Sequence, residues 1–380
     1  MADAVVTRVV LDVSAVPDNP AGAGRYVLDL VDALAVRTDV DLILVSRHDD
    51  VGRWPDGVEV LDLAPARRPV RLAWEQARLP ALLKKLDFDV YHGPHYTMPE
   101  PAQTPKVVTV HDLTFFDHPE WHERSKAPFF RRAIRVAARH SSAIVCVSRT
   151  TANRLIELCP PQVPVAVIPH GVDHSRFTPA PPSPEADRAA LEALGVRGPF
   201  VAFVGTLEPR KDVPSLVRAF DRIAGVHKDL SLVIAGGAGW GVKEVDRAIA
   251  QARHRARVLK TGYVADDAVP ALLRSAAVVA YPSLEEGFGL PALEALACAA
   301  PLVSTTGSAM EEVAAGAALL VPPGDADALS GALDMAVRQD AGLASRRERG
   351  LVVASRHTWA ASAARHAEVY RAVSRPPAPA

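Results

Sequence analysis

The sequence predicts two α/β domains, each a parallel sheet with helices on both faces, the arrangement called doubly wound. Three observations lead to this prediction. The chain has 380 residues, enough for two to three domains of about 150 residues. Short β-branched runs alternate with amphipathic segments of helix length, as they do in parallel α/β proteins. One proline-rich segment interrupts this alternation and indicates a domain boundary.

Five strands are expected in the first half of the chain, and the alternation ends with another apolar run at 165–169. The five are 5–13, 41–46, 90–91, 106–110 and 143–147, with helix-length segments between them. The next segment contains Pro179, Pro181, Pro182 and Pro184, and prolines at this density continue neither a helix nor a strand. We therefore expect a first domain over 1–172 and an interdomain linker over 173–198.

The second half repeats the alternation. Strands are expected at 200–205, 230–236, 258–263, 277–282, 301–305 and 318–321, which gives a second domain over 199–355. In the last segment, 356–380, apolar residues recur at helical spacing, namely Trp359, Ala363, Ala367, Tyr370 and Val373. This spacing predicts an amphipathic helix followed by a frayed proline-rich tail, and we expect the helix to pack back on the first domain.

Composition and charge exclude several classes of protein. Lys and Arg number 43 and Asp and Glu 44, a net charge of −1, so the chain lacks the basic excess of a dedicated nucleic-acid-binding protein. Its three cysteines lie in apolar runs, which is typical of buried thiols in a reducing compartment. The charged residues Asp3, Arg8 and Asp12 are unlike a secretion signal, and no uncharged stretch reaches the ~20 residues of a spanning helix. We expect a cytoplasmic protein, free or at the inner face of the membrane.

The most informative segment, 281–297, has the pattern of a strand, a glycine loop and a helix that begins near Pro291. Gly287 and Gly289 allow a ligand to approach the backbone, and the first N–H groups of the helix favour a phosphate. Glu286 and Glu294 flank this loop. Because a carboxylate repels a diphosphate and accepts hydrogen bonds, we expect one to face a sugar and the other a ribose. A solvated Glu286 and a helix-stabilising Glu294 would explain this segment alone equally well.

A second segment points to the same chemistry. The strand expected at 200–205 ends in Gly205, and a turn then presents Arg210 and Lys211 before the amphipathic run 213–223. Two adjacent cations at this position could stabilise the charge that develops on a leaving diphosphate. Taken alone, an Arg-Lys pair is more often a solvated surface feature.

Together, these segments resemble the retaining GT-B glycosyltransferases of family 4 over essentially the whole chain. The resemblance is carried by 22–26, 168–173, 205–211, 232–236 and the Glu286/Glu294 pair, in order and at the usual spacing. It implies two Rossmann-like domains that face each other across a cleft, the first binding the acceptor and the second the nucleotide sugar. Open parallel sheets bind ligands beyond the carboxyl ends of their strands, which agrees with this expectation.

The resemblance also implies roles for individual residues. Glu286 would hold hydroxyl groups of the donor sugar, Glu294 the ribose, and Arg210 with Lys211 the diphosphate. Backbone contacts to phosphate are implied at Gly24 and at 288–290, and contacts to the base near Tyr263 and Val264. The full donor-binding set is Gly24, Gly205, Tyr263, Val264, Gly287, Phe288, Gly289, Leu290 and Glu294.

The sequence departs from the family pattern at two places. Many relatives have Arg directly after the glycine of the strand that ends at Gly205, where this chain has Thr206. One cation of the usual pair is therefore absent, or Arg210 replaces it. The stretch 310–313 lacks the proline that often precedes its Glu-Val pair, so we leave it out of the site.

His111 follows the strand expected at 106–110. The resemblance implies that it meets the donor sugar at the reaction centre, as a fourth catalytic residue beside Arg210, Lys211 and Glu286, whereas from the residues alone a capping or core histidine is favoured. Ser148, which precedes the helical run 151–158, is interpreted as an N-cap.

Three other patterns are given structural interpretations. Asp87 and Asp89 match a metal-binding Asp-x-Asp of another glycosyltransferase fold, but they lie where helix and strand caps are common. His92 and His95 are separated by Gly93-Pro94, which prevents a helix from bringing them together. The glycines of 236–241 lack the dinucleotide-binding spacing, so a dehydrogenase is disfavoured, and we expect neither a metal nor a cofactor.

A basic segment runs from Trp121 to Arg139. It holds one acidic residue, Glu123, three aromatic residues, Trp121, Phe129 and Phe130, and six basic residues, Arg124, Lys126, Arg131, Arg132, Arg135 and Arg139. This segment is interpreted as an acceptor site, as a helix in peripheral contact with the membrane, or as a helix that buries its aromatic rings and solvates its arginines.

These expectations combine into one function. The chain is expected to transfer a hexose, with mannose favoured, from a nucleotide diphosphate sugar to a hydroxyl of a glycan or lipid-linked acceptor, with retention and without a metal. GDP-mannose is favoured because 205–211 and 111–116 most resemble bacterial mannosyl- and rhamnosyltransferases. UDP-glucose and UDP-N-acetylglucosamine are competing donors. The alternatives are a sugar-nucleotide 2-epimerase of the same architecture and a non-catalytic sugar-nucleotide binder.

Overall fold

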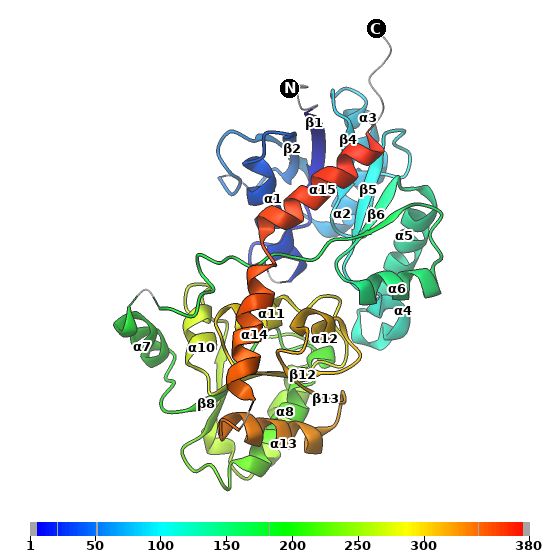
Figure 1. Ribbon diagram of the computed structural model, residues 1–380. Helices are drawn as coiled ribbons and strands as arrows, with labels where there is room; N and C mark the ends of the chain where they lie inside the picture. Colours follow the sequence, from blue (N-terminus) through cyan, green and yellow to red (C-terminus); the bar gives the residue numbers. More distant parts are fainter. Residues whose placement is uncertain (1–5, 21, 51, 182, 341, 375–380) are drawn as a thin grey trace. The chain divides into compact units, whose positions relative to one another are not determined.

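The computed structural model describes residues 6–374 except 21, 51, 182 and 341. The chain divides into two compact units, Met1–Gly171 together with Trp359–Ala380, and Val172–Thr358. Each unit has its own parallel sheet (Figure 1), so the prediction of two α/β domains is confirmed. Residue 5 of the first expected strand and the tail after Ser374 lie outside the described residues.

Within the described residues, the first unit holds a seven-stranded sheet with the order β3-β2-β1-β4-β5-β6-β7. Its paired strands all run parallel. The strand order reverses between β1 and β4, the place where open parallel sheets bind ligands. The strands are β1 (Thr7–Asp12), β2 (Val40–Arg47), β3 (Glu59–Ala64), β4 (Val90–Gly93), β5 (Lys106–Val110), β6 (Ala143–Cys146) and β7 (Val165–Val167).

The helices of the first unit lie between these strands, with one addition from the end of the chain. They are α1 (Ala23–Ala35), α2 (Arg68–Ala77), α3 (Leu79–Leu83), α4 (Thr114–Asp117), α5 (Lys126–His140), α6 (Arg149–Leu158) and α15 (Trp359–Val373), with the 3₁₀ turn η1 (Pro119–Trp121). In Figure 1, α15 appears in red beside α1 and β1, which lie at the opposite end of the sequence.

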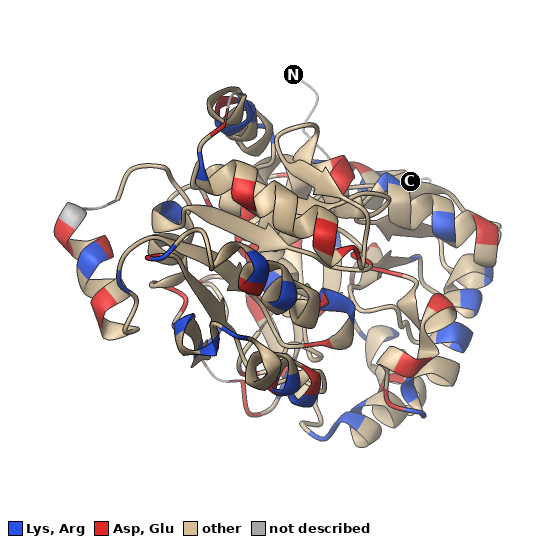
Figure 2. Cartoon of the chain, turned by 90° about the horizontal axis from the view of Figure 1, so that it is seen from below, with Lys and Arg blue, Asp and Glu red and all other residues tan. Residues whose placement is uncertain are grey.

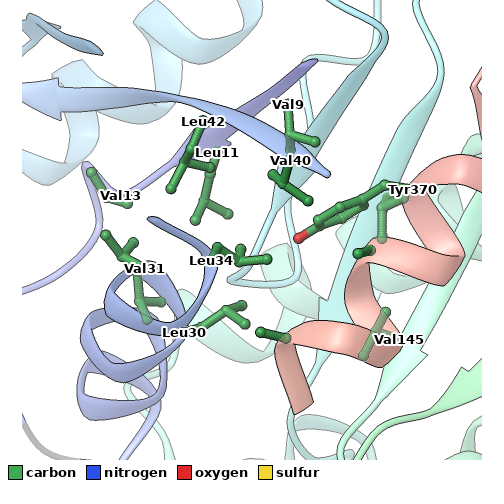
Figure 3. Packing of buried hydrophobic residues seen from close by; sticks show 14 of the residues in the cluster. Val9, Leu11, Val13, Leu30, Val31, Leu34, Val40, Leu42, Val145 and Tyr370 are labelled. Atoms are coloured by element: carbon green, nitrogen blue, oxygen red, sulfur yellow. The ribbon is translucent and has the colours of Figure 1, made fainter. Parts of the chain in front are cut away.

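The apolar face of α15 is part of the core of the first unit. Its buried residues Trp359, Ala363, Ala367 and Tyr370 pack with residues of β1, β2 and α1. Figure 3 shows the Tyr370 ring beside Val9 and Val40. Burial of each large side chain contributes about 1.5–3 kcal/mol relative to its exposure to water, so the helix is a substantial part of this core.

A buried chain of hydrogen bonds also joins α15 to the sheet. His366 Nε2 lies 3.0 Å from the Tyr26 hydroxyl, which lies 3.0 Å from Thr109 Oγ1. Thr109 Oγ1 lies 2.8 Å from His92 Nε2, and His92 Nδ1 lies 2.7 Å from the Tyr370 hydroxyl. The chain therefore starts and ends on α15 and passes through α1, β5 and β4.

The described part of the second unit holds a six-stranded sheet with the order β10-β9-β8-β11-β12-β13. Its strand pairs are also parallel, and the order reverses between β8 and β11. The strands are β8 (Phe200–Val204), β9 (Ser231–Ala235), β10 (Val258–Gly262), β11 (Val278–Tyr281), β12 (Leu302–Thr305) and β13 (Leu319–Val321). Its helices are α7 (Pro184–Ala193), α8 (Val213–Ile223), α9 (Val242–Gln251), α10 (Val269–Ser275), α11 (Leu290–Ala297), α12 (Ala309–Ala314), α13 (Ala326–Val337) and α14 (Leu343–Ser355), with the 3₁₀ turns η2 (Pro209–Lys211) and η3 (Arg255–Arg257).

The segment expected as a linker, 173–198, contains helix α7. Ser183 caps it by accepting a hydrogen bond from the Ala186 N–H, and Pro184 occupies its first turn. Asp187 forms an ion pair with Arg274 of α10, at 2.6 Å. The last proline of the run therefore begins a helix, because proline is well tolerated at the first helical position.

Charges of both signs are distributed over the surface of the chain. In the view of Figure 2, both basic and acidic positions occur on the helices, in agreement with a net charge of −1. In the part of the chain that is described, no helix combines the length and the apolar character needed to cross a membrane.

Candidate active site

The candidate site of the second unit lies at the carboxyl edge of its sheet. The adjacent strands β8, β11 and β12 end at Val204, Tyr281 and Thr305. The loops after β8 and β11 carry the residues that the sequence singles out, and these two strands flank the point at which the strand order reverses. This is the position at which doubly wound sheets bind ligands.

Arg210, Lys211 and Glu286 form one ionic cluster at this edge. Lys211 Nζ donates a hydrogen bond to Glu286 Oε1, and Arg210 Nη1 donates to Glu286 Oε2 at 2.6 Å. Glu286 is 8% exposed and Lys211 7%. Charges buried this deeply persist only when they are paired and hydrogen-bonded. The structure thus brings Glu286 together with the adjacent Arg210 and Lys211, which precede it by 76 and 75 positions in the sequence.

The two cations keep the Glu286 carboxylate ionised. Burial by itself raises the pKa of this carboxyl, but Arg210 and Lys211 outweigh burial and lower the pKa of Glu286 to about 2. For Lys211, burial and the neighbouring Arg210 lower the pKa of the ammonium, and Glu286 opposes both effects. A dense, water-poor group of charges at the end of a parallel sheet is suited to bind a charged ligand.

Three residues to which the sequence analysis gave no role hold this cluster in place. Ser283 Oγ donates to Glu286 Oε1 at 2.9 Å, and Thr305 Oγ1 donates to the Ser283 carbonyl at 2.6 Å. Glu208 Oε2 accepts from Arg210 Nε at 2.8 Å. One signal could have found the first two, because Thr305 ends β12 and Ser283 follows the end of the adjacent parallel strand β11 by two residues.

Helix α11 begins directly after the glycine loop. Gly289 is its N-cap, with φ of +97°, a conformation that residues with a Cβ rarely adopt. A Cβ at this position would also lie 2.8 Å from Met310 Cγ, so both backbone and packing require glycine here. The first N–H groups of a helix have no acceptor within the helix, and they carry the positive end of its dipole. The expected helix is confirmed, and it begins at Leu290, so Pro291, expected as its first residue, is its second.

Glu294 lies within α11 and is half-buried. Burial raises the pKa of the Tyr281 hydroxyl, and the negative charge of Glu294 raises it further, which places Glu294 near the end of β11. In the described residues the Tyr281 hydroxyl is buried without a hydrogen-bond partner. Phe288 and Leu290, on either side of Gly289, have buried side chains, so only their backbone atoms remain for ligand contacts.

The glycines after β9 support the turn that carries Arg210. The Gly205 N–H donates to the Ala235 carbonyl at 2.9 Å, and a Cβ on Gly236 would lie 1.9 Å from the Gly205 carbonyl oxygen. A Cβ on Gly239 would lie 2.5 Å from the Leu207 carbonyl oxygen. These glycines therefore allow two loops to pack backbone against backbone. A Cβ on Gly205 itself would lie no closer than 3.5 Å to a neighbouring atom, which belongs to the Phe203 ring.

The residues expected near the base follow β10, two strands away from β8. The Tyr263 side chain is 64% exposed, whereas Val264 is buried. The preceding Gly262 has φ of +73°, which turns the chain sharply at the end of the strand. Of the two, Tyr263 is the residue whose side chain is available to a ligand.

His111 and Gly24 belong to the first unit. His111 follows β5, and its Nε2 lies 2.8 Å from the Pro94 carbonyl oxygen. Because a carbonyl only accepts hydrogen bonds, Nε2 carries the proton. Burial lowers the pKa of this imidazole, and its ring packs edge-on against Tyr26 at 5.1 Å. Gly24 lies in the first turn of α1, where a Cβ would be 3.0 Å from Pro20 Cβ.

Three residues of the other motifs, Ser148, Asp89 and His92, make structural hydrogen bonds. Ser148 is the N-cap of α6 and accepts a hydrogen bond from the Thr151 N–H at 3.0 Å, as predicted. Asp89 Oδ2 accepts from the Arg8 N–H at 2.7 Å, and His92 is held in the buried chain of hydrogen bonds described above. Across the described ranges, no group of three or more His, Cys, Asp or Glu side chains is placed to hold a metal ion.

Two family models match the chain, one in each unit. Residues 20–176 match Glycosyltransferase Family 4, and residues 190–350 match Glycosyl transferases group 1. A relative in Escherichia coli, O-antigen chain mannosyltransferase B, is 27% identical over 364 residues, which cover 89% of this chain and 92% of the relative. The chain belongs to the GT-B glycosyltransferases, and it is an enzyme with the domains of group 1 and family 4.

Solved structures agree on the fold. Sucrose-phosphate synthase from Thermosynechococcus elongatus superposes with a TM-score of 0.79 at 20% identity, covering 96% of this chain and 98% of that chain. HepE from Anabaena, solved in complex with UDP and glucose, superposes with a TM-score of 0.77 at 21% identity, covering 96% of this chain and 100% of that chain. At these identities the likeness concerns the fold.

Proposed function

We propose that this glycosyltransferase moves mannose from GDP-mannose to a hydroxyl of a glycan or lipid-linked acceptor, with retention of configuration and without a metal. The observation that carries the proposal is the cluster of Arg210, Lys211 and Glu286 at the carboxyl edge of the second sheet. It joins two cations to one ionised carboxylate beside the N-terminus of α11. A diphosphate and a hexose together need this combination of groups.

In the proposed mechanism, the bond from the anomeric carbon to the diphosphate oxygen breaks while the acceptor oxygen approaches the same face of the sugar. Arg210, Lys211 and the first N–H groups of α11 stabilise the negative charge that develops on the diphosphate. Glu286 accepts hydrogen bonds from sugar hydroxyls, and His111 contacts the transferred sugar. The leaving diphosphate takes up the proton of the acceptor hydroxyl.

The remaining donor contacts are proposed in the same way. Glu294 binds the ribose, and Tyr263 and Val264 lie beside the base. The backbone of Gly24, Phe288, Gly289 and Leu290 binds the phosphates, and Gly205 and Gly287 complete the donor-binding set. The choice of mannose is supported by the E. coli mannosyltransferase relative, and the main competitor is UDP-glucose, since HepE was solved with UDP and glucose.

One assay tests the reaction and the donor together. Purified protein is incubated with GDP-mannose, UDP-glucose and UDP-N-acetylglucosamine, and release of nucleoside diphosphate is measured with and without EDTA. We expect release from GDP-mannose only, unchanged by EDTA. Steady turnover without nucleoside diphosphate would instead indicate a 2-epimerase, and metal-reversible loss of activity would contradict the metal-independent mechanism.

Thermal shift gives an independent view of the donor. A ligand at about 100 times its Kd stabilises the folded state by about 2.7 kcal/mol, which corresponds to a Tm increase of several degrees. We expect GDP to raise the Tm and UDP to leave it unchanged. Protection by UDP alone would reject mannose transfer from GDP-mannose and leave the reaction class intact.

We also propose that the protein works in the cytoplasm and meets the inner face of the membrane through the basic segment from Trp121 to Arg139, which η1 and α5 occupy. Four of its arginines, Arg124, Arg132, Arg135 and Arg139, are exposed. Basic residues near an anionic bilayer contribute about 1 kcal/mol each to its binding.

A further inference from the structure

A second group of polar side chains lies at the carboxyl edge of the first sheet, where β1 and β4 flank the reversal of strand order. Asp12 is the last residue of β1, and His95 follows β4 by two residues. Arg71 and Glu75 lie one turn apart on α2. This edge is the position at which a doubly wound sheet binds its ligand, and no role has yet been assigned to these four residues.

Glu75 is buried with one oxygen unused. The residue is 5% exposed, and its Oε2 accepts a hydrogen bond from Thr97 Oγ1 at 3.1 Å. Among the described residues its Oε1 is buried without a partner. An unsatisfied buried oxygen destabilises a fold, and native proteins rarely keep one without a reason. Fold stability alone does not explain a carboxyl group at this position.

The surroundings of Glu75 keep its carboxyl group neutral. Burial raises the pKa of Glu75 to about 8, and the neighbouring Asp12 raises it as well, while Arg71 opposes them. A neutral carboxyl group both donates and accepts hydrogen bonds. Asp12 is itself fixed, since its Oδ2 accepts from the Tyr91 hydroxyl at 2.9 Å.

His95 adds a second unused polar atom from a different element. Its Nε2 is buried and has no hydrogen-bond partner in the described residues. Burial, with smaller effects of the neighbouring His111 and Arg71, lowers the pKa of His95 to about 3. The charge of Arg71 therefore lowers the pKa of both Glu75 and His95, so the three residues lie in one group.

The chemistry of this group fits hydroxyl groups. A neutral carboxyl, a neutral imidazole and a guanidinium can together donate and accept several hydrogen bonds, as the alternating donors and acceptors of a sugar require. Two further arginines, Arg47 and Arg68, also act on the pKa of Arg71, but Arg47 is held in ion pairs with Asp18 and Asp50. A phosphate is disfavoured, because Asp12 places a carboxylate beside Arg71. The ligand that matches is an uncharged sugar.

We propose that Glu75, Arg71 and His95 bind hydroxyl groups of an uncharged sugar unit of the acceptor. This inference rests on the proposed glycosyl transfer and specifies the acceptor class for that reaction. The group lies within the first unit and does not include the residues proposed to bind the donor.

The test replaces Glu75 by an apolar side chain of similar length. Glu75→Met removes both hydrogen-bonding oxygens without leaving a large cavity, and Glu75→Gln keeps one acceptor and a donor. The matched control is Glu120→Gln, because Glu120 is an exposed carboxylate elsewhere in the first unit. Binding of methyl α-mannoside and methyl α-glucoside is measured by saturation-transfer NMR with GDP present, and the Tm of each variant is recorded.

For Glu75→Met we expect glycoside binding to weaken about tenfold, the loss that follows from one or two hydrogen bonds. Its Tm should equal or exceed that of the wild type, since an unsatisfied buried oxygen has been removed. Glu75→Gln should retain binding within about threefold, and Glu120→Gln should change neither property. If Glu75 served only stability, Glu75→Met would instead lower the Tm and leave glycoside binding unchanged.

Three results would overturn the inference: no binding of either glycoside to the wild type, wild-type binding by Glu75→Met, or tighter binding of mannose 6-phosphate than of methyl α-mannoside. Protection by GDP or UDP and release of nucleoside diphosphate are measured on the same samples. If these donor properties fail in the wild type while the glycoside results hold, the proposed transfer is wrong and the sugar site stands.

Discussion

Both oxygens of Glu286 are occupied by the cations that are proposed to bind the diphosphate. A bound diphosphate therefore competes with an internal carboxylate for Arg210 and Lys211. If the two cations bind the diphosphate as proposed, this competition would limit how tightly the product nucleotide is held, because each cation keeps Glu286 as a partner when the nucleotide leaves. A cluster with an internal anion suits an enzyme that must release its product in every cycle.

The first prediction concerns Lys211. Lys211→Ala should lower kcat by about 10²–10³-fold, the effect of removing one preorganised group that stabilises developing charge. The control is Lys228→Ala, since Lys228 is exposed and lies after α8. Single-turnover rates and Tm are measured for both variants. A kcat within threefold of wild type for Lys211→Ala would remove this residue from the mechanism.

The second prediction separates the two glutamates. Glu294→Ala should raise the Kd for the nucleoside diphosphate by roughly 10- to 100-fold, because hydrogen bonds to a charged group contribute about 1.5–3 kcal/mol. Glu286→Ala should mainly lower turnover. Calorimetry gives the Kd, and single-turnover kinetics give the rate. Wild-type nucleotide binding and wild-type rates in both variants would show that neither glutamate has its proposed role.

At the scale of elements, the basic and aromatic side chains of α5 make several structural contacts within the first unit. Arg131 Nε donates to the Phe115 carbonyl at 2.6 Å, and Arg132 forms an ion pair with Glu100. The Phe130 ring stacks on Phe115 with centroids 4.5 Å apart. These contacts leave only part of the basic segment available for a membrane or an acceptor.

The third prediction uses the arginines of this segment that are exposed. If α5 meets an anionic bilayer, co-sedimentation with liposomes should increase with the fraction of anionic lipid and decrease with salt. The double variant Arg124→Glu, Arg139→Glu should abolish it, whereas Arg222→Glu, an exposed arginine of the second unit, should not. Co-sedimentation that is indifferent to lipid charge would contradict the membrane contact.

The elements also show what a sequence can predict. Buried parallel strands read as continuous apolar runs, and five were expected in the first unit and six in the second. Two of the seven strands of the first unit were not among the five. The apolar run at 165–169 contains β7 but was not assigned to a strand, and β3 was missed because its Glu59–Ala64 segment is an edge strand with exposed positions, which breaks the apolar run. Helix α7 was missed because Pro184 begins it, and proline was interpreted only as a breaker.

The candidate site likewise combines residues that local sequence patterns predict with contacts that only the fold creates. Glycine loops, cations and paired glutamates have local patterns, so Arg210, Lys211 and Glu286 could be found from the sequence. Their mutual ion pairs could not, because those depend on strands β8 and β11 lying side by side. Ser283, Thr305 and Glu75 are polar residues with no motif, and only their burial and hydrogen bonds reveal them.

At the scale of the whole molecule, the buried histidines link stability to pH. His366 Nδ1 lies 2.8 Å from the Ser362 carbonyl oxygen, so Nδ1 carries the proton and Nε2 accepts from the Tyr26 hydroxyl. Burial lowers the pKa of His366 to about 4 and that of His92 well below its usual value.

The fourth prediction follows from the sign of these shifts. A histidine whose pKa is lowered in the folded state binds a proton more readily in the unfolded state. Its contribution to stability is therefore complete above the unfolded-state pKa of about 6.5 and is lost as the pH falls toward 4. The free energy of unfolding should fall by up to ~1.4 kcal/mol per pH unit for each such histidine. Urea unfolding between pH 7.5 and 4.5 measures this slope.

The variants for this prediction are His366→Gln and the exposed control His140→Gln. His366→Gln should be less stable at pH 7.5, because a hydrogen bond to Tyr26 is altered, and its stability should depend less on pH. The control should keep the wild-type slope. An unchanged slope for His366→Gln would show that this histidine is not a source of the pH dependence.

The return of α15 to the first unit affects how the protein is made. The core around β1 and α1 includes Trp359, Ala363 and Tyr370, which leave the ribosome after the whole of Val172–Thr358. At about 5–20 residues per second, translation delays their arrival by roughly 10–40 s. During that time the nascent first unit exposes the surface that α15 will cover, whereas the second unit completes its sheet. The N-terminal half of the chain is therefore the last to become protease-resistant during synthesis, and a premature stop near residue 358 releases a chain with a finished second unit and an open first core.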